Sequence, residues 1–169
     1  MSKVIKNKKT LICVYKALCE SILRYGLTSW GTATPSNLLR VKRLQTALLR
    51  IIHNTRSTTN TNLFELYKVL PVEYLYTELM VTYHYYDSKY KINSTRVHEG
   101  RSTATYKRFI EPTFNNNHGK RELCFTIPLI FNQLPETMFN IEGIGKVKAR
   151  VRQWLLDNIN SLPNTIIIN

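Results

Sequence analysis

The feature that most constrains the fold is the segment Ser36–Ile52, which places apolar and basic residues with the period of an α-helix. At about 100° per residue, the apolar residues collect on one half of a helical wheel. No acidic residue interrupts the other half, although helix surfaces usually gain from opposite charges four residues apart. The segment therefore predicts an amphipathic helix with a wholly basic polar face. The apolar half holds Leu38, Val41, Leu44, Leu48, Leu49, Ile51 and Ile52, and the polar half holds Arg40, Lys42, Arg43, Arg50 and His53.

The charge of the whole chain is concentrated around this segment. The 169 residues carry a formal net charge of +13. Residues 1–60 hold eleven Lys or Arg and a single acid, Glu20, whereas residues 61–100 hold four bases and five acids and residues 101–169 hold nine and five. A folded monomer gains nothing from gathering like charges in one third of its length, so this distribution favours an anionic partner.

Three further segments have helical periodicity. Thr10–Tyr25 is an expected helix that Gly26 ends. Val72–Tyr90 contains most of the tyrosines and shows two apolar stripes, which predict a central helix packed on both sides. For these tyrosines we favour a position in the core over stacking on bases, because they share a helix face with leucines and the segment has a net charge near zero. Lys146–Ile159 is the last amphipathic segment.

The expected fold class is mainly α: a bundle of about five or six helices with a small β-hairpin in the C-terminal half. The hairpin would pair Tyr106–Phe114 with Glu122–Thr126 around a Gly-containing turn, because Leu123, Phe125 and Ile127 alternate as in a half-buried strand. We expect three parts: a basic helical subdomain over residues 1–60, a Tyr-rich helical pair over 61–92, and a mixed segment over 93–169.

Several classes of site find no support. The three cysteines, Cys13, Cys19 and Cys124, are too few and too scattered for a disulfide framework or a zinc site. Nucleophile-elbow, P-loop and HExxH motifs are missing. Gly143–Lys146 could bind one phosphate at a helix start, although such glycines more often only turn the chain. No run approaches the roughly 20 apolar residues of a membrane span, and the basic start lacks a signal-peptide core. We expect an intracellular protein, in nucleus or cytoplasm, with no membrane partner.

Four groups of residues occur in an order found in a known family. The stretch Tyr15–Gly26 with Trp30-Gly31 comes first, followed by Leu44–Ile52, then Leu63–Leu66 with Leu70–Val72, and finally Gly119–Arg121 with Pro128–Pro135. This order and spacing resembles the region beyond the palm in reverse transcriptases of non-LTR retrotransposons of the jockey type. The resemblance covers about residues 10–160.

The resemblance implies a parent RNA-directed DNA polymerase whose palm holds two metal ions on paired aspartates. The only aspartates here, Asp87 and Asp157, are not paired, so this chain is expected to need no cofactor and to have no polymerase activity alone. It would be the thumb and the linker beyond it, clamping the backbone of an RNA–DNA or DNA duplex beside the missing palm. The phosphate contacts would come from Arg40, Lys42, Arg43 and Arg50. The alternatives are a protein-interaction helical module and a decayed mobile-element remnant without activity.

Overall fold

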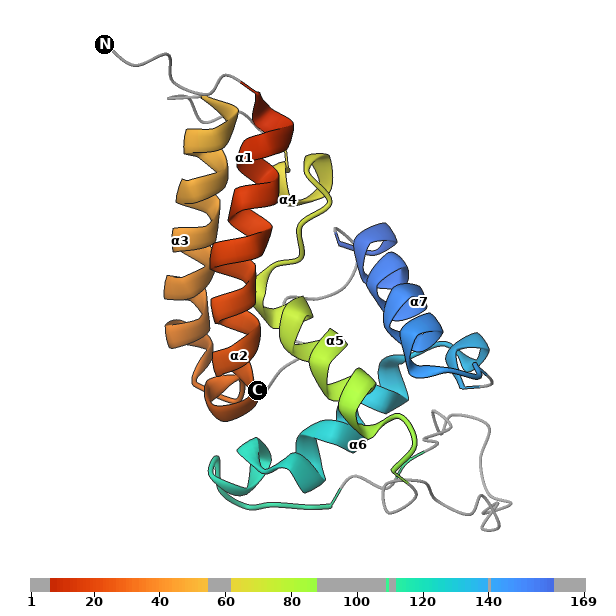
Figure 1. Ribbon diagram of the computed structural model, residues 1–169. Helices are drawn as coiled ribbons and strands as arrows, with labels where there is room; N and C mark the ends of the chain where they lie inside the picture. The colour runs from red at the N-terminus through yellow and green to blue at the C-terminus, as the bar shows by residue number, and fades with distance from the viewer. Residues whose placement is uncertain (1–6, 55–61, 88–108, 110–111, 140, 160–169) are drawn as a thin grey trace.

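The computed structural model describes residues 7–54, 62–87, 109, 112–139 and 141–159. In this part of the chain all regular structure is helical, which confirms the mainly α prediction (Figure 1). The helices are α1 (Lys8–Tyr15), α2 (Ser21–Trp30), α3 (Pro35–His53), α4 (Leu63–Leu66), α5 (Val72–His84), α6 (Leu123–Gln133) and α7 (Ile144–Asp157). A π-helical turn, η1 (Lys16–Glu20), joins α1 to α2, and short 3₁₀ turns lie at η3 (Gly119–Arg121) and η4 (Glu136–Met138).

The predicted β-hairpin is wrong where the structure describes it. Glu122–Thr126 is not a strand, because α6 starts at Leu123 and continues through Pro128. The partner segment Tyr106–Phe114 lies largely outside the described residues, and its described positions form no strand. The alternation at Leu123, Phe125 and Ile127 is too short to fix a period of two. Apart from Pro128, the buried residues follow the helical pattern i, i+1, i+4, i+5, i+8 instead: Thr126, Ile127, Ile130, Phe131 and Leu134.

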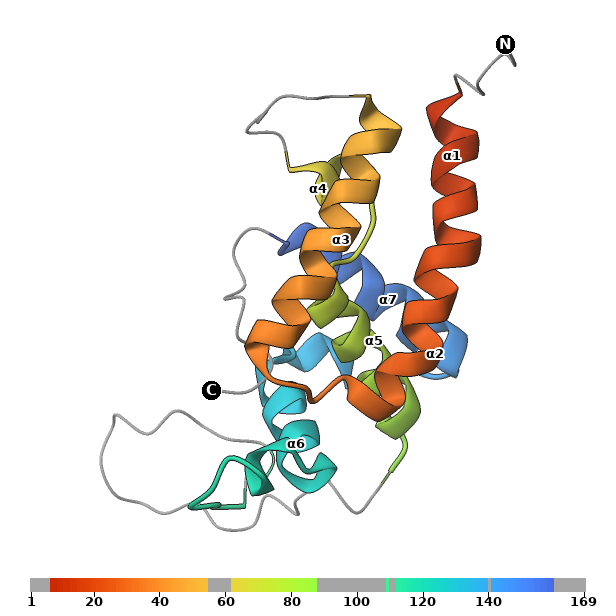
Figure 2. The ribbon, with the colours of Figure 1, turned by 90° about the vertical axis from the view of Figure 1, so that its left-hand side faces the viewer.

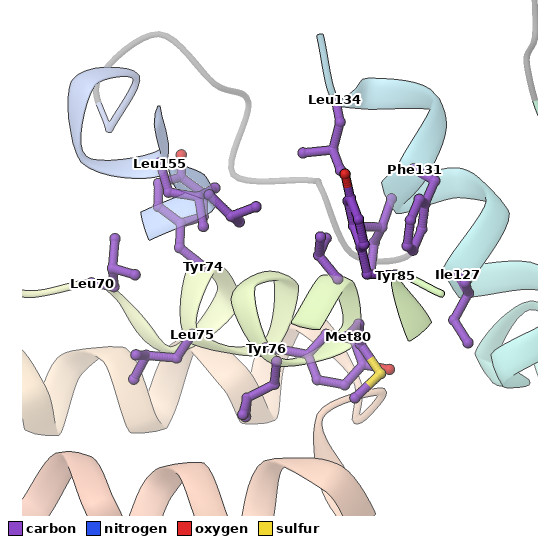
Figure 3. Packing of buried hydrophobic residues seen from close by; sticks show 14 of the residues in the cluster. Leu70, Tyr74, Leu75, Tyr76, Met80, Tyr85, Ile127, Phe131, Leu134 and Leu155 are labelled. Atoms are coloured by element: carbon purple, nitrogen blue, oxygen red, sulfur yellow. The ribbon is translucent and has the colours of Figure 1, made fainter. Parts of the chain in front are cut away.

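Helix α5 forms the centre of the molecule. Every residue from Val72 to Val81 is buried, and the helix contacts α2, α3, α6 and α7. This confirms the prediction of a helix packed on both sides. Tyr74, Tyr76 and Tyr85 belong to the main hydrophobic core (Figure 3), whereas Tyr83 remains exposed.

The α1–α2 segment and α3 run antiparallel and form a hairpin against α5 (Figures 1 and 2). Gly26 does not end the helix, as the sequence suggested, but lies inside α2. A Cβ at Gly26 would overlap the indole of Trp30, and one at Gly31 would overlap the ring of Tyr76. Glycine at these two positions therefore serves close packing.

The buried side of α3 is narrower than its apolar half. Only Leu38, Gln45 and Leu49 of this helix are buried. Leu44 and Ile51, which the wheel groups with the apolar half, are 66% and 74% exposed. A polar residue, Gln45, lies at the centre of the buried face because its amide is hydrogen-bonded to Tyr15 of α1, to Val72 of α5 and to Leu70 just before α5.

Candidate nucleic-acid interface

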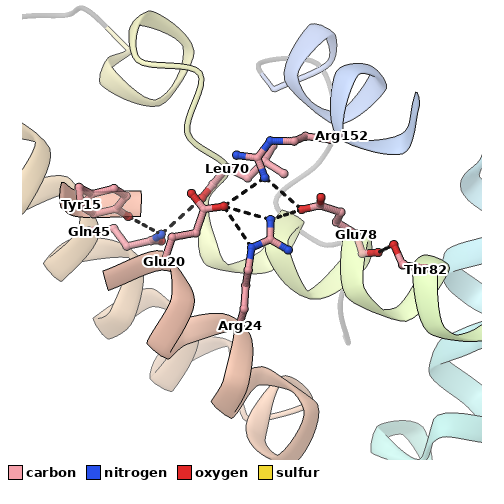
Figure 4. Close-up of polar contacts among 8 residues, drawn as sticks. All are labelled: Tyr15, Glu20, Arg24, Gln45, Leu70, Glu78, Thr82 and Arg152. Carbon is pink, nitrogen blue, oxygen red and sulfur yellow. Dashed lines mark hydrogen bonds and ion pairs between the residues drawn. The ribbon is translucent and has the colours of Figure 1, made fainter. Parts of the chain in front are cut away.

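Gln45 fixes α3 to the rest of the bundle through its side-chain amide (Figure 4). Its Nε2 donates to the hydroxyl of Tyr15 at 3.0 Å and lies 3.4 Å from the carbonyl oxygen of Leu70. Its Oε1 accepts from the backbone N–H of Val72 at 2.9 Å. That N–H is one of the free donors at the start of α5, where Pro71 provides no side-chain cap. Gln45 thus joins α1, α3 and α5 and caps the central helix.

Burial also affects the ionisation of Tyr15. The side chain is 3% exposed, and this burial raises the pKa of Tyr15 to about 12, with the hydrogen bond from Gln45 opposing the rise. The phenol therefore stays neutral and available to Gln45 at any ordinary pH.

Three of the four predicted phosphate-binding residues lie on the outer side of α3. Arg40, Arg43 and Arg50 are all exposed, and none forms an ion pair within the described part of the chain. At about 100° per residue they project within a sector of about 80°, opposite Gln45. At about 1.5 Å per residue they span about 15 Å of the helix axis. The arrangement is a short row of arginines that point to solvent.

The fourth residue, Lys42, has a different environment. Its side chain is half-buried, and its Nζ lies 3.3 Å from Oε1 of Glu73 on α5. Glu73 is itself buried, so this ion pair holds α3 against α5. Lys42 faces the bundle, and the structure does not group it with the three arginines. No local sequence pattern indicates this pair, because its members are far apart in the chain.

Glu20, the single acid among residues 1–60, is removed from the surface by a cluster of four charges (Figure 4). Oε1 of Glu20 accepts from Arg24 at 3.0 and 3.1 Å and from Arg152 of α7 at 3.1 Å. Both arginines also bond Oε2 of Glu78 on α5, Arg152 at 3.3 Å. Burial opposes the charge of Arg24, but the contacts with Glu78 and Glu20 outweigh it and raise the pKa of Arg24.

The cluster is neutral and ties α2, α5 and α7 together. Its two carboxylates are buried, Glu20 at 5% and Glu78 at 0% exposure. As a result, every exposed charged side chain between residues 7 and 54 is basic. These are Lys8, Lys9, Lys16, Arg40, Arg43 and Arg50.

A cavity of about 410 Å³ opens beside this cluster, between α2 and α7. Gly145, from the glycine pair that the sequence suggested for a phosphate, lies in its wall. Oε2 of Glu20 and Oε1 of Glu78 have no hydrogen-bond partner there. The same wall holds three basic side chains, Arg24, Lys148 and Arg152, of which Arg24 and Arg152 are paired with these carboxylates. Its lining residues are Glu20, Arg24, Glu78, Gly145, Lys148, Ala149 and Arg152.

Compared with known protein families, curated proteins and solved structures, the chain matches none. Among the described residues, no group of three or more His, Cys, Asp or Glu side chains could hold a metal ion. None of the helices in the described ranges is long and apolar enough to cross a membrane. The arginine row of α3 is therefore the candidate site, and all exposed charged side chains between residues 7 and 54 are basic.

Proposed function

We propose that the chain holds a nucleic-acid duplex by its phosphate backbone, through Arg40, Arg43 and Arg50, as a non-catalytic part of an RNA-directed DNA polymerase of a non-LTR retrotransposon. The observation that carries the proposal is the wholly basic set of exposed charges on α1–α3. The polymerase context rests on the motif resemblance in the sequence. The missing aspartate pair excludes the two-metal chemistry of such an enzyme from this chain.

Arginine suits this role because its guanidinium presents several donors in a plane and binds a phosphate with two parallel hydrogen bonds. Arg43 and Arg50 are seven residues apart, two helical turns, and therefore share one side of α3. Contacts of this kind position a protein on a duplex but read no sequence. The proposed activity is thus affinity for backbone, with little preference among sequences.

The first test is the salt dependence of duplex binding. Each phosphate neutralised on a B-form duplex contributes about −0.9 to the slope of log K against log salt. Four contacts would give about −3.6, but with Lys42 paired to Glu73 three arginines remain, and the expected slope is about −2.7. The measurement is fluorescence anisotropy of the full chain with a labelled RNA–DNA hybrid and with two DNA duplexes of unrelated sequence. A slope near zero, or strong preference between the two DNA sequences, would contradict the proposal.

A further inference from the structure

Two rows of large apolar side chains lie exposed on the α1–α3 hairpin. The first row follows α1, η1 and α2 with the spacing i, i+4, i+8, i+11: Val14, Leu18, Ile22 and Tyr25, which range from 47% to 88% exposed. The second follows α3 with the spacing i, i+4, i+7: Leu44, Leu48 and Ile51, which range from 38% to 74% exposed. We call these the outer apolar rows.

The two rows lie on the same side of the hairpin. Tyr15 and Gln45 are hydrogen-bonded to each other across it. Val14 directly precedes Tyr15, and Leu44 directly precedes Gln45. Each is therefore turned about 100° around its own helix axis from its neighbour, in the same sense. Because the helices are antiparallel (Figure 2), rotations of the same sense from a contacting pair lead to the same face. The two arms of the hairpin lie closest where α1 meets α3 and diverge toward α2 (Figure 2), so the rows border a seam that widens toward α2.

Such an arrangement is typical of a binding surface. Monomeric proteins expose single apolar residues commonly, but large contiguous apolar patches seldom, and those patches usually meet a partner. The charged residues around these rows on α1–α3 are basic, since Glu20 is buried. The seam therefore combines an apolar centre with a positive rim.

We propose that the outer apolar rows bind an amphipathic helix with acidic flanks, supplied by a partner protein. Leucine-type side chains at i, i+3, i+4 and i+7 of such a helix would fit between the rows, as in helix-in-groove recognition. The acidic flanks would meet the basic rim and improve association. A second copy of this chain fits poorly, because each copy carries a net charge of +13. A nucleic acid fits poorly as well, because six of the seven side chains are aliphatic and offer phosphates no donors and bases no stacking surface, which leaves Tyr25 as the one aromatic member.

The proposal does not rest on the proposed function. On the wheel of α3, Arg43 and Arg50 lie about 80–160° from the residues of the outer apolar row, whereas Arg40 lies only about 20–80° from them. A partner helix on the rows and a duplex on Arg43 and Arg50 would therefore use different sides of α3, and these two arginines are the ones that separate the two activities. Loss of one activity therefore says nothing about the other, and variants can separate them.

The probe is a capped peptide of about 20 residues, long enough to be helical, with leucine at every third or fourth position and glutamate and alanine elsewhere. The reference is a peptide of the same composition with its leucines scattered around the helix. Anisotropy titration of the full chain with the first peptide should show saturable binding, and the scattered peptide should bind much more weakly. If both peptides bound with equal affinity, peptide charge and not the leucine face would determine binding, and the proposal would be overturned.

Two matched double variants locate the site. Leu18→Gln with Leu44→Gln, at 60% and 66% exposure, should weaken peptide binding roughly tenfold or more. Leu66→Gln with Leu123→Gln changes two exposed leucines of α4 and α6 in the same way and should leave binding unchanged. Thermal melts confirm that both variants fold.

The results that overturn the proposal are equal losses in the two variants and absence of peptide binding. If the peptide does not bind, sedimentation velocity measures self-association of the chain, and vesicles of 3:1 phosphatidylcholine and phosphatidylserine measure membrane binding. Dependence of self-association or of vesicle binding on Leu18 and Leu44 would then assign the rows to a second copy or to an anionic membrane surface.

Discussion

Helices α5 and α3 are both rich in apolar residues, but they use them in opposite ways. Helix α5 is buried from Val72 to Val81, including two glutamates and a threonine. Helix α3 buries only Leu38, Gln45 and Leu49, and leaves Leu44 and Ile51 in solvent.

The difference shows which surface of the molecule is available for a partner. In α5 even the charged residues have partners inside the bundle, such as Glu78 with Arg24 and Arg152. In α3 the exposed arginines have no such partner among the described residues, and the apolar residues exceed what the core needs. We therefore infer that α5 serves the stability of the bundle, and we propose that the outer side of α3 serves binding.

The largest expected effect comes from truncating one leucine in each helix. Leu75 of α5 is fully buried, so Leu75→Ala should lower the free energy of unfolding by about 3–5 kcal/mol through lost burial and a residual cavity. Leu44→Ala should change it by less than about 0.5 kcal/mol, because Leu44 is mostly exposed. Urea unfolding followed by circular dichroism measures both. Similar losses of unfolding free energy in the two variants would contradict the contrast between α5 and α3.

A smaller effect is expected from the charge cluster. Glu78→Gln leaves two arginines with a single carboxylate, Glu20, and should lower the free energy of unfolding by about 3 kcal/mol. The value lies at the low end for buried pairs, because the arginines reach solvent at 19% and 25% exposure. Glu142→Gln, at an exposed position, is the matched control and should have almost no effect. A Glu78→Gln variant as stable as the control would mean that the cluster does not hold α2 and α7 on α5.

The smallest stability effect concerns Tyr15 at alkaline pH. Its pKa is about 12 in the folded protein and about 10 in an unfolded chain. As the pH rises from about 10 to 12, the unfolded state loses the phenolic proton while the folded state keeps it, so stability falls. The loss is at most about 2.7 kcal/mol, at about 1.36 kcal/mol per pKa unit.

The variant Tyr15→Phe isolates this contribution. It removes the titrating group, so its unfolding free energy should fall less steeply than that of the wild type between pH 9 and 11.5. Chemical unfolding at several pH values in this range gives both curves. Parallel curves would show that burial of Tyr15 does not govern its ionisation.

The sequence predicted the helices whose periodicity is long and missed the features that depend on distant partners. Helix α3 was expected at Ser36–Ile52 and spans Pro35–His53, and the two stripes of α5 correctly indicated two-sided packing. The prediction of a strand within α6 is wrong, because three alternating residues cannot separate a period of 2 from one of 3.6. The burial of Gln45 was equally hidden.

The exposure of three of the four candidate site residues could be predicted from the sequence, and the environment of Lys42 could not. The wheel placed Arg40, Arg43 and Arg50 outside the apolar half, and they are exposed. Lys42 is also basic, but it forms an ion pair with Glu73 of α5. A wheel describes one helix alone, so it could show neither that pair nor the exposure of Leu44 and Ile51.

The most direct test of the account compares two variants that lose the same charge from different helices. Arg43→Ala with Arg50→Ala changes the outer side of α3, and Lys146→Ala with Arg150→Ala changes exposed bases of α7. Binding of each to an RNA–DNA hybrid is measured over a range of salt concentrations. The account predicts that the α3 variant binds roughly tenfold or more weakly at low salt, with a slope smaller by about 1.8, while the α7 variant stays close to the wild type. Equal binding by the α3 variant and the wild type at low salt, or equal losses in both variants, would contradict it.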